Sequence, residues 1–248
     1  MTLAIHALNL GEMELDYSFY VWGTNQGTLL RIPTTCWLIT GADKPILVDA
    51  SFRSPEAVTE ATGFRAWRSP EQTLEAQLAK HQLTPADIGY LVHTHLHEDH
   101  TGLDDQVPNA RILLQRAELQ YAAAPLFPHP FYDRVDIAKL VGPLWNRIEL
   151  LDGESELFPG IRTVLTGGHS PAHQMLYIEV PSGTAIIAGD AAYIAEMNIG
   201  KQLPMGYFVN LKEVMAALQL LARETREGKY ILPSHDAAVY QLYPDGVR

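Results

Sequence analysis

Three imidazoles and two carboxylates lie within six consecutive residues of this 248-residue chain, in the run His95-Leu96-His97-Glu98-Asp99-His100. Imidazole and carboxylate groups are common protein ligands of divalent transition metals. By composition, a His-x-His-x-Asp-His pattern arises by chance in roughly one chain of this size in a thousand. The run therefore predicts a metal site. The alternative, a solvated histidine-rich turn, gives no reason for three imidazoles at fixed spacing.

Three further candidate ligands each follow an apolar stretch that predicts a β-strand; they are His169, Asp190 and His235. A single histidine at the end of a strand is more often a hydrogen-bonded structural residue than a metal ligand. Here the same placement occurs four times when the run 95–100 is included. We therefore expect the four segments to converge on one site.

The elements that must position these residues are strands and helices of ordinary length. Apolar stretches bounded by turn residues predict strands at 36–40, 45–49, 88–92, 111–115, 149–151, 161–165, 175–180, 185–188 and 229–232. Periodic apolar residues predict helices over 72–83, over 117–124 and after Asn210, an N-cap residue with Glu213 three residues later. The strand at 88–92 ends just before the ligand run, where open α/β sheets place their chemistry.

Composition and charge exclude several classes of protein. A chain of this length with 47% hydrophobic residues can bury a sizeable core. Its formal net charge of −11 disfavours nucleic acid as a partner. No segment approaches the roughly 20 apolar residues of a membrane span, and the first residues lack a basic signal region, so we expect a cytoplasmic protein without membrane contact. The only cysteine, Cys36, lies in an apolar strand and is expected to be a buried thiol.

In its ordered pattern His-x-His-x-Asp-His, His, Asp, His, the chain resembles the metallo-β-lactamase superfamily over nearly its whole length. The resemblance implies an α/β fold, a four-layer αβ/βα sandwich formed by residues 1–248 as one domain, with a binuclear site on one edge. It also implies a ligand set. The first metal would be held by His95, His97 and His169, the second by Asp99, His100 and His235, and both by the bridging Asp190. Zinc suits these ligands best, although iron, manganese or cobalt would also fit.

Two more histidines lie close to the implied ligands in the sequence. His93 comes two residues before His95, and His173 comes four residues after His169. The resemblance assigns neither of them to a metal. We expect both to support the ligands from behind by hydrogen bonding.

Within the superfamily, the chain is most similar to the N-acyl homoserine lactonases, which are quorum-quenching enzymes. The likeness is carried by the phrase Gly168-His169-Ser170-Pro171-Ala172-His173-Gln174, by Pro45-Ile46-Leu47-Val48-Asp49 and by Tyr193, three residues after Asp190. It implies that the Tyr193 hydroxyl points at the substrate carbonyl. The alternative is an ordinary half-buried tyrosine.

The resemblance and general metal chemistry together predict a binuclear metallohydrolase that opens a lactone or a related small ester. Two metals would lower the pKa of a shared water, and the resulting bridging hydroxide would attack the carbonyl. One metal and Tyr193 would stabilise the charge on the carbonyl oxygen, and Asp99 would pass a proton to the leaving alkoxide. No Gly-x-Ser-x-Gly elbow supports a serine mechanism.

Glu98 departs from the lactonase pattern. It occupies a position inside the ligand run where acyl-homoserine lactonases can carry an apolar residue that faces the acyl chain. A buried carboxylate there would disfavour an apolar tail. The alternative is that Glu98 turns outward to solvent. The sequence leaves both orientations open.

Two other segments also allow two interpretations each. Residues 116–147 contain a proline-spaced stretch, 125–135, that forms either a lid over the pocket or plain surface packing. The aromatic stretch 17–22 forms either a pocket wall or a dimer contact, so a homodimer is considered. We favour the lid for the first segment and leave the second open.

Two rival functions remain. One is another hydrolase of the same superfamily, such as a thioesterase or an aryl ester or ether hydrolase, which would share all seven ligands. The other is a noncatalytic metal-binding or partner-binding protein, against which the complete ligand set argues. Bound metal and acid release from lactones, aryl esters and thioesters distinguish these functions.

Overall fold

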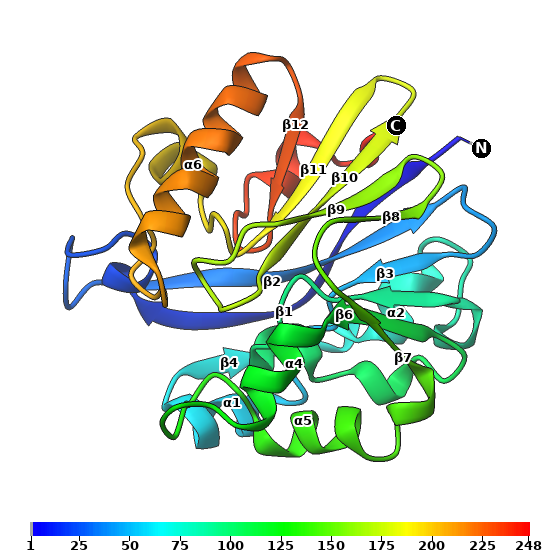
Figure 1. Ribbon diagram of the computed structural model, residues 1–248, viewed down its shortest axis with the longest axis horizontal. Coiled ribbons are helices and arrows are strands. Elements are labelled where there is room, and N and C mark those ends of the chain that lie inside the picture. The colour runs from blue at the N-terminus through cyan, green and yellow to red at the C-terminus, as the bar shows by residue number, and fades with distance from the viewer. Residues whose placement is uncertain (1) are drawn as a thin grey trace.

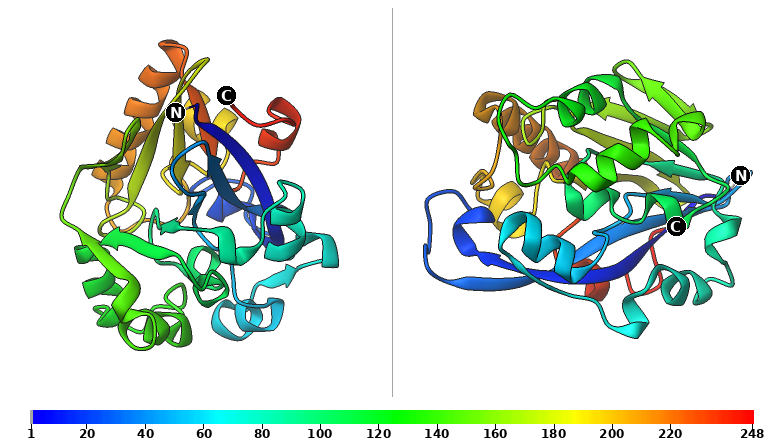
Figure 2. Two further views of the ribbon diagram at one scale, coloured as in Figure 1. Left: turned by 90° about the vertical axis from the view of Figure 1, so that its right-hand side faces the viewer. Right: turned by 90° about the horizontal axis from the view of Figure 1, so that it is seen from below.

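The computed structural model describes residues 2–248, in which two β-sheets pack face to face with helices on both outer sides (Figures 1 and 2). The larger sheet has the order β4-β1-β2-β3-β5-β6-β7. Its strands are β1 Ala4–Asp16, β2 Leu29–Thr40, β3 Ile46–Val48, β4 Arg65–Trp67, β5 Tyr90–Val92, β6 Arg111–Gln115 and β7 Ile148–Leu151. The smaller sheet has the order β12-β11-β10-β9-β8. Its strands are β8 Ser155–Phe158, β9 Ile161–Leu165, β10 Gln174–Val180, β11 Gly183–Gly189 and β12 Tyr230–Pro233.

The helices cover the outer faces of the two sheets (Figure 1). They are α1 Pro55–Thr62, α2 Leu74–Ala79, α3 Glu98–Thr101, α4 Arg116–Ala123, α5 Arg134–Val141, α6 Leu211–Arg226 and α7 Val239–Leu242. Buried residues of α2, α4 and α5 pack on the larger sheet, and those of α6 pack on the smaller one. No helix in the described part of the chain is long and apolar enough to cross a membrane.

The alternation of side chains along each strand produces the layers. In β2, Cys36 and Leu38 belong to the core beneath the helices, whereas Trp37 and Ile39 belong to the core between the two sheets. Successive residues of a strand point to opposite faces, so strands with two buried faces are apolar throughout. The molecule is therefore the four-layer αβ/βα sandwich that the sequence resemblance implies.

The predicted strands agree well with the observed ones. Each of the nine predicted stretches contains or overlaps a strand, and the first two form the expected antiparallel hairpin, with Trp37 opposite Val48. The helix predicted over 72–83 is wrong at both ends. Residues Pro70–Gln72 form a 3-10 turn, Thr73 caps the short helix α2, and Gln82 adopts a left-handed φ of 61° that stops it.

The sequence analysis missed strand β1, the longest in the structure. Its pairing with β2 shifts register between Asn9 and Glu12, and this bulge interrupts the alternation of apolar residues. Gly11 lies in the bulge with φ of 141°, and a Cβ there would come within 2.4 Å of the Phe52 ring. The bulge therefore requires glycine and hides the strand from a period-two pattern.

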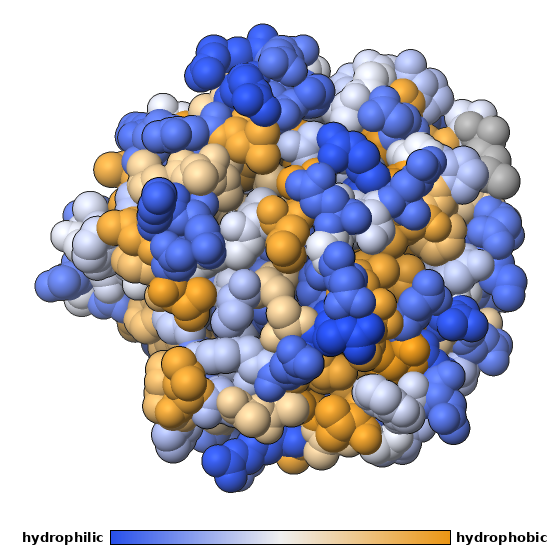
Figure 3. Space-filling view, in the orientation of Figure 1, coloured by the Kyte–Doolittle hydropathy of each residue, from blue (hydrophilic) through white to orange (hydrophobic). Residues whose placement is uncertain are grey.

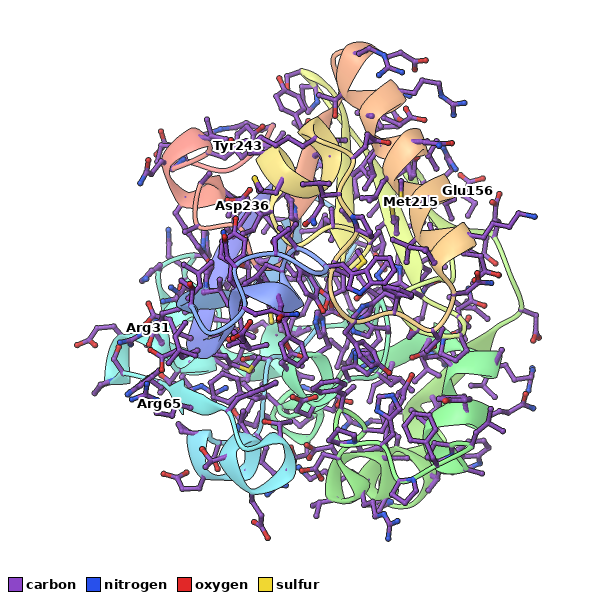
Figure 4. The ribbon with its side chains drawn as sticks, turned by 90° about the vertical axis from the view of Figure 1, so that its left-hand side faces the viewer. Arg31, Arg65, Glu156, Met215, Asp236 and Tyr243 are labelled. Carbon is purple, nitrogen blue, oxygen red and sulfur yellow. The ribbon has the colours of Figure 1, made fainter. Side chains whose placement is uncertain are left out.

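At the edge of the larger sheet, Arg31 and Arg65 lie close together (Figure 4). The Arg31 guanidinium stacks 4.2 Å from the centre of the Trp67 ring and pairs with Glu12, while Arg65 pairs with Glu14. Charged side chains on an edge strand discourage pairing with another chain. Elsewhere, polar and apolar side chains are interspersed on the face seen in Figure 3.

Candidate metal centre

The candidate ligands leave the strands at one edge of the two sheets. Strands β3, β5 and β6 run parallel, and β5 ends at Val92, just before the ligand run. In the smaller sheet the parallel strands β11 and β12 end one residue before Asp190 and two residues before His235. The fourth segment, with His169, connects β9 to β10. Carboxyl ends of parallel strands meet at one edge, which explains the convergence.

One group of three imidazoles forms the first half of the cluster. Nδ1 of His97 lies 3.0 Å from Nε2 of His95 and 3.0 Å from Nε2 of His169. The ligand atoms of the three side chains all lie within 4.8 Å of one another. All three residues are buried.

A second group consists of Asp99, His100 and His235, whose ligand atoms also lie within 4.8 Å of one another. Asp190 stands between the two groups. Its Oδ1 lies 3.3 Å from Nε2 of His100 and 3.2 Å from Nε2 of His235. Its Oδ2 lies 3.4 Å from Nε2 of His169. The two oxygens of one carboxylate thus face the two groups, as the sequence analysis expects of a bridging ligand.

The donor set fits divalent cations. His100 Nε2 and Asp190 Oδ1 are buried and have no hydrogen-bond partner among the described residues. Buried polar atoms are nearly always satisfied, so unsatisfied atoms that face one another call for an occupant. Nitrogen and carboxylate oxygen at these separations match the ligand preferences of zinc and similar ions.

Electrostatics keeps the first group ready to bind a cation. Burial lowers the pKa of His95 and His97 well below the usual range and lowers that of His169 to about 4. Imidazole binds a metal only in its neutral form. In the second group, burial disfavours the protonated imidazoles of His100 and His235. The attraction of the Asp190 and Asp99 carboxylates is stronger than this effect, so the pKa of both histidines is raised. Cation binding there displaces protons.

Hydrogen bonds from the Nδ1 atoms of three imidazoles fix the orientation of the rings, whose Nε2 atoms face the cluster. The Nδ1 atoms of His235 and His169 donate to the backbone carbonyls of Pro33 and Tyr207, at 2.9 and 3.3 Å. His100 Nδ1 contacts Oδ2 of Asp49 at 2.8 Å. Such partners fix the tautomer of a ligand and increase its basicity.

His173 supports a candidate ligand by a hydrogen bond, as expected from the sequence, whereas His93 contacts Asp104, which is not a candidate ligand. His93 Nε2 lies 3.1 Å from Oδ2 of Asp104. Nε2 of His173 accepts a hydrogen bond from the backbone N–H of Asp190 at 3.0 Å. Neither residue belongs to the ligand groups described above.

A narrow cavity of about 30 Å³ adjoins the cluster. Its polar wall contains His97, Glu98, Asp99, His169, Asp190, Tyr193 and Tyr207, and its apolar wall contains Met13, Leu15, Phe19, Phe64 and Phe131. Phe131 comes from the stretch predicted as a lid and Phe19 from the aromatic stretch 17–22, so both segments contribute to the cavity wall.

Tyr193 packs edge-on between the two metal-ligand groups. Its ring centre lies 5.7 Å from that of His169 and 5.1 Å from that of His235. The residue is 8% exposed and lines the cavity, so the alternative of an ordinary half-buried tyrosine is wrong. Burial and then the Asp190 carboxylate raise the pKa of Tyr193, so its hydroxyl keeps its proton at neutral pH.

Comparison with known proteins agrees with this geometry. Residues 30–235 match the family model described as the metallo-beta-lactamase superfamily. The chain belongs to this superfamily. It is 30% identical to an N-acyl homoserine lactonase of Bacillus cereus over 235 residues, 91% of this chain and 90% of the relative. It is 27% identical to the N-acyl homoserine lactonase AttM of Azorhizobium caulinodans over 249 residues, 94% and 93% of the two chains.

Solved structures of the superfamily show the same fold. A crystal structure of B. thuringiensis AiiA with N-decanoyl-L-homoserine bound at its active site superposes with a TM-score of 0.84, at 25% identity and with both chains fully covered. AidC, described as a dizinc quorum-quenching lactonase, superposes with a TM-score of 0.74 over 95% of this chain and 88% of its own. At 17% identity, AidC supports the fold alone.

Residues outside the candidate ligand groups also hold the site together. The sequence analysis missed Glu118, a buried residue of α4. Its carboxylate accepts hydrogen bonds from the Leu96 N–H, the Ser170 hydroxyl, the Ala172 N–H and the Tyr132 hydroxyl. It therefore ties together the ligand run, the His169 loop and the segment over the cavity. A glutamate within a helix gives no sequence signal for such a role.

Helix α6 also contributes to the site, in a way the sequence predicted only in part. Asn210 caps the helix, and its side chain accepts from the N–H groups of Lys212 and Glu213. Glu213, three residues after the cap, contacts another segment. Its Oε2 accepts from the Gly168 N–H at 2.9 Å and so holds the loop that carries His169.

Proposed function

We propose that this protein is a metal-dependent hydrolase that opens lactone rings. One observation carries the proposal: the two carboxylate oxygens of Asp190 face two separate ligand groups beside a cavity that Tyr193 lines. Such an arrangement suits a two-metal centre that activates water and polarises a carbonyl. The N-acyl homoserine lactonases of B. cereus and A. caulinodans support the choice of a lactone.

We assign the ligands by the atoms that face one another. His95, His97 and His169 would hold one ion, Asp99, His100 and His235 would hold the other, and Asp190, which faces both groups, would contribute to each. Zinc is the proposed metal because neutral imidazoles predominate among the ligands. Two divalent ions, when bound, lower the pKa of water toward neutrality and so supply a nucleophile at pH 7.

The protein's own groups complete the reaction. The protonated Tyr193 hydroxyl donates a hydrogen bond to the carbonyl oxygen, where negative charge develops. Asp99 would accept a proton and deliver it to the ring oxygen as the alkoxide leaves. The apolar wall, with Phe131 over the cavity, limits bulk water near the reacting carbonyl.

The test begins with the metal content of the purified protein, followed by acid release from lactones, aryl esters and thioesters. We expect two metals per chain and turnover of lactones above that of the other classes. Tyr193→Phe should lower kcat by at least about tenfold, as for removal of one oxyanion donor, with metal content unchanged. Two bound metals with no ester turnover would refute the hydrolase, and a thioester preference would refute the lactonase.

A further inference from the structure

The carboxyl group of Glu98 is buried at the cavity without a partner. The residue is 4% exposed, and no group among the described residues donates to its Oε2. Its backbone N–H donates to the Phe131 carbonyl at 2.8 Å, which fixes the start of helix α3 against the segment over the cavity. Of the two orientations that the sequence leaves open, the buried one is therefore observed.

Glu98 is not part of the metal cluster. Glu98 belongs to neither of the two ligand groups described above, nor to the overlapping group of His95, His100 and Asp190. The neighbouring residue Asp99 supplies the carboxylate of the second group, whereas Glu98 lines the adjacent cavity. Its unpaired oxygen thus needs a hydrogen-bond donor other than a side chain of the site.

No residue of the described cavity wall donates to this oxygen, although the wall includes the hydroxyls of Tyr193 and Tyr207. On the apolar side, Phe19 packs edge-on against Phe64 at 5.2 Å and against Phe131 at 6.4 Å between ring centres, and Phe64 stacks on Phe131 at 6.2 Å. Burying a polar atom against apolar surface is unfavourable unless a hydrogen bond satisfies it. The donor must therefore come from the occupant of the cavity.

The position of Glu98 also limits where that donor sits. Because Glu98 and Asp99 are consecutive and line one narrow cavity, a group that reaches Glu98 lies close to the carbonyl under attack. With three phenyl rings in contact around about 30 Å³, a long alkyl chain would have to displace them. A short substituent needs a smaller displacement.

We propose that Glu98 selects lactones that carry a hydrogen-bond donor, such as a hydroxyl group, on the carbon next to the ring carbonyl, and that it rejects long alkyl chains there. The proposal rests on lactone hydrolysis at this same site. Glu98 acts on the substrate directly as a hydrogen-bond acceptor and takes no part in metal binding.

The test compares two lactones of nearly equal size, α-hydroxy-γ-butyrolactone and α-methyl-γ-butyrolactone, with the metal-loaded enzyme. We expect kcat/KM to favour the hydroxy compound by at least about tenfold, because the methyl group leaves the buried oxygen unpaired. Glu98→Leu should abolish or reverse this preference. Glu98→Gln keeps an acceptor, so it should retain the hydroxyl preference.

Binding gives a second readout that does not depend on turnover. The corresponding α-hydroxy and α-methyl lactams resist hydrolysis, and calorimetry on the metal-loaded protein should show the same order of affinity. Metal content should be equal in both Glu98 variants. Glu75→Gln, which alters an exposed glutamate on α2, is the matched control and should change neither ratio.

The outcomes separate this proposal from the proposed function. If the wild-type enzyme opens none of the lactones while the lactams still bind in the predicted order, lactone hydrolysis is refuted and the selection by Glu98 stands. If the hydroxy and methyl compounds react and bind equally, or if an N-decanoyl lactone is preferred and Glu98→Leu does not alter that preference, the role of Glu98 is refuted.

Discussion

Oδ2 of Asp49 lies 2.8 Å from Nδ1 of His100, so a residue at the end of β3 orients a proposed metal ligand that stands 51 positions later in the chain. The same carboxylate accepts hydrogen bonds from the N–H and the hydroxyl of Thr94, each at 2.8 Å. Thr94 directly precedes His95. Asp49 thereby couples the position of one ligand in each of the two groups.

This contact leads to a prediction about metal affinity. Asp49 has a left-handed φ of 61°, which asparagine tolerates, so Asp49→Asn removes the charge without added backbone strain. We expect zinc affinity to fall by roughly 10- to 100-fold, as for other partners of metal-bound histidines. Competition with a chromophoric chelator measures the change. Asp245→Asn, at an exposed site, is the control, and equal affinities of the two variants would contradict the role of Asp49.

Glu118 predicts an effect on stability that does not require metal. Glu118→Ala leaves four donors without their acceptor inside the protein, including the Leu96 N–H and the Ser170 hydroxyl. We expect the free energy of unfolding to fall by at least about 2 kcal/mol in the metal-free protein. Urea unfolding in the presence of a chelator measures this. Glu118→Gln should be less harmful, because its amide oxygen still accepts, and a loss seen only in the metal-loaded protein would argue against the explanation.

The parts of the site that sequence could predict are those encoded locally. The run His95 to His100 places three ligands within six residues, and His169, Asp190 and His235 each follow a recognisable strand. Convergence then follows from the rule that parallel strands end at one edge. Family likeness supplied the division of the ligands into two groups, which the observed distances match.

The remaining features depend on contacts between segments far apart in the chain. The burial of Glu98 is fixed by a backbone hydrogen bond to Phe131, and the role of Glu118 by donors from three different segments. Strand β1 was missed because its bulge at Gly11 breaks the alternation of apolar residues. No local pattern in the sequence encodes these contacts.

Asp136 predicts a pH dependence of stability away from the metal centre. Burial and then the Asp133 carboxylate raise the pKa of Asp136 to about 6, although Lys139 and Arg53 contact it. The unfolded chain loses this proton near pH 4, whereas the folded protein keeps it until about pH 6. Asp136 therefore stabilises the fold least above pH 6, and its contribution declines as the pH rises from 4 to 6.

Asp136→Asn tests whether the stability contribution of Asp136 falls as the pH rises, because asparagine does not titrate. Relative to the wild type, the variant should gain stability on the order of 2 kcal/mol between pH 4 and pH 7, measured by urea unfolding at each pH. Asp105→Asn alters an exposed partner of the same Lys139 and should show no such gain. A stability difference that stays constant from pH 4 to pH 7 would contradict the raised pKa.

Metal removal should destabilise the folded chain without unfolding it. The three apolar cores lie in the sheets and helices and do not depend on the metal cluster, so the metal-free protein should remain folded. A ligand that binds only the folded state adds about 4 kcal/mol per site at a thousandfold excess over its Kd. For a chain of 248 residues this corresponds to roughly 10 °C in Tm for each site. Calorimetry with and without a chelator measures the shift. Asp190→Asn weakens the link between the two groups and should reduce this Tm shift. A Tm that stays constant after proven metal loss would exclude metal binding by these residues in the folded state.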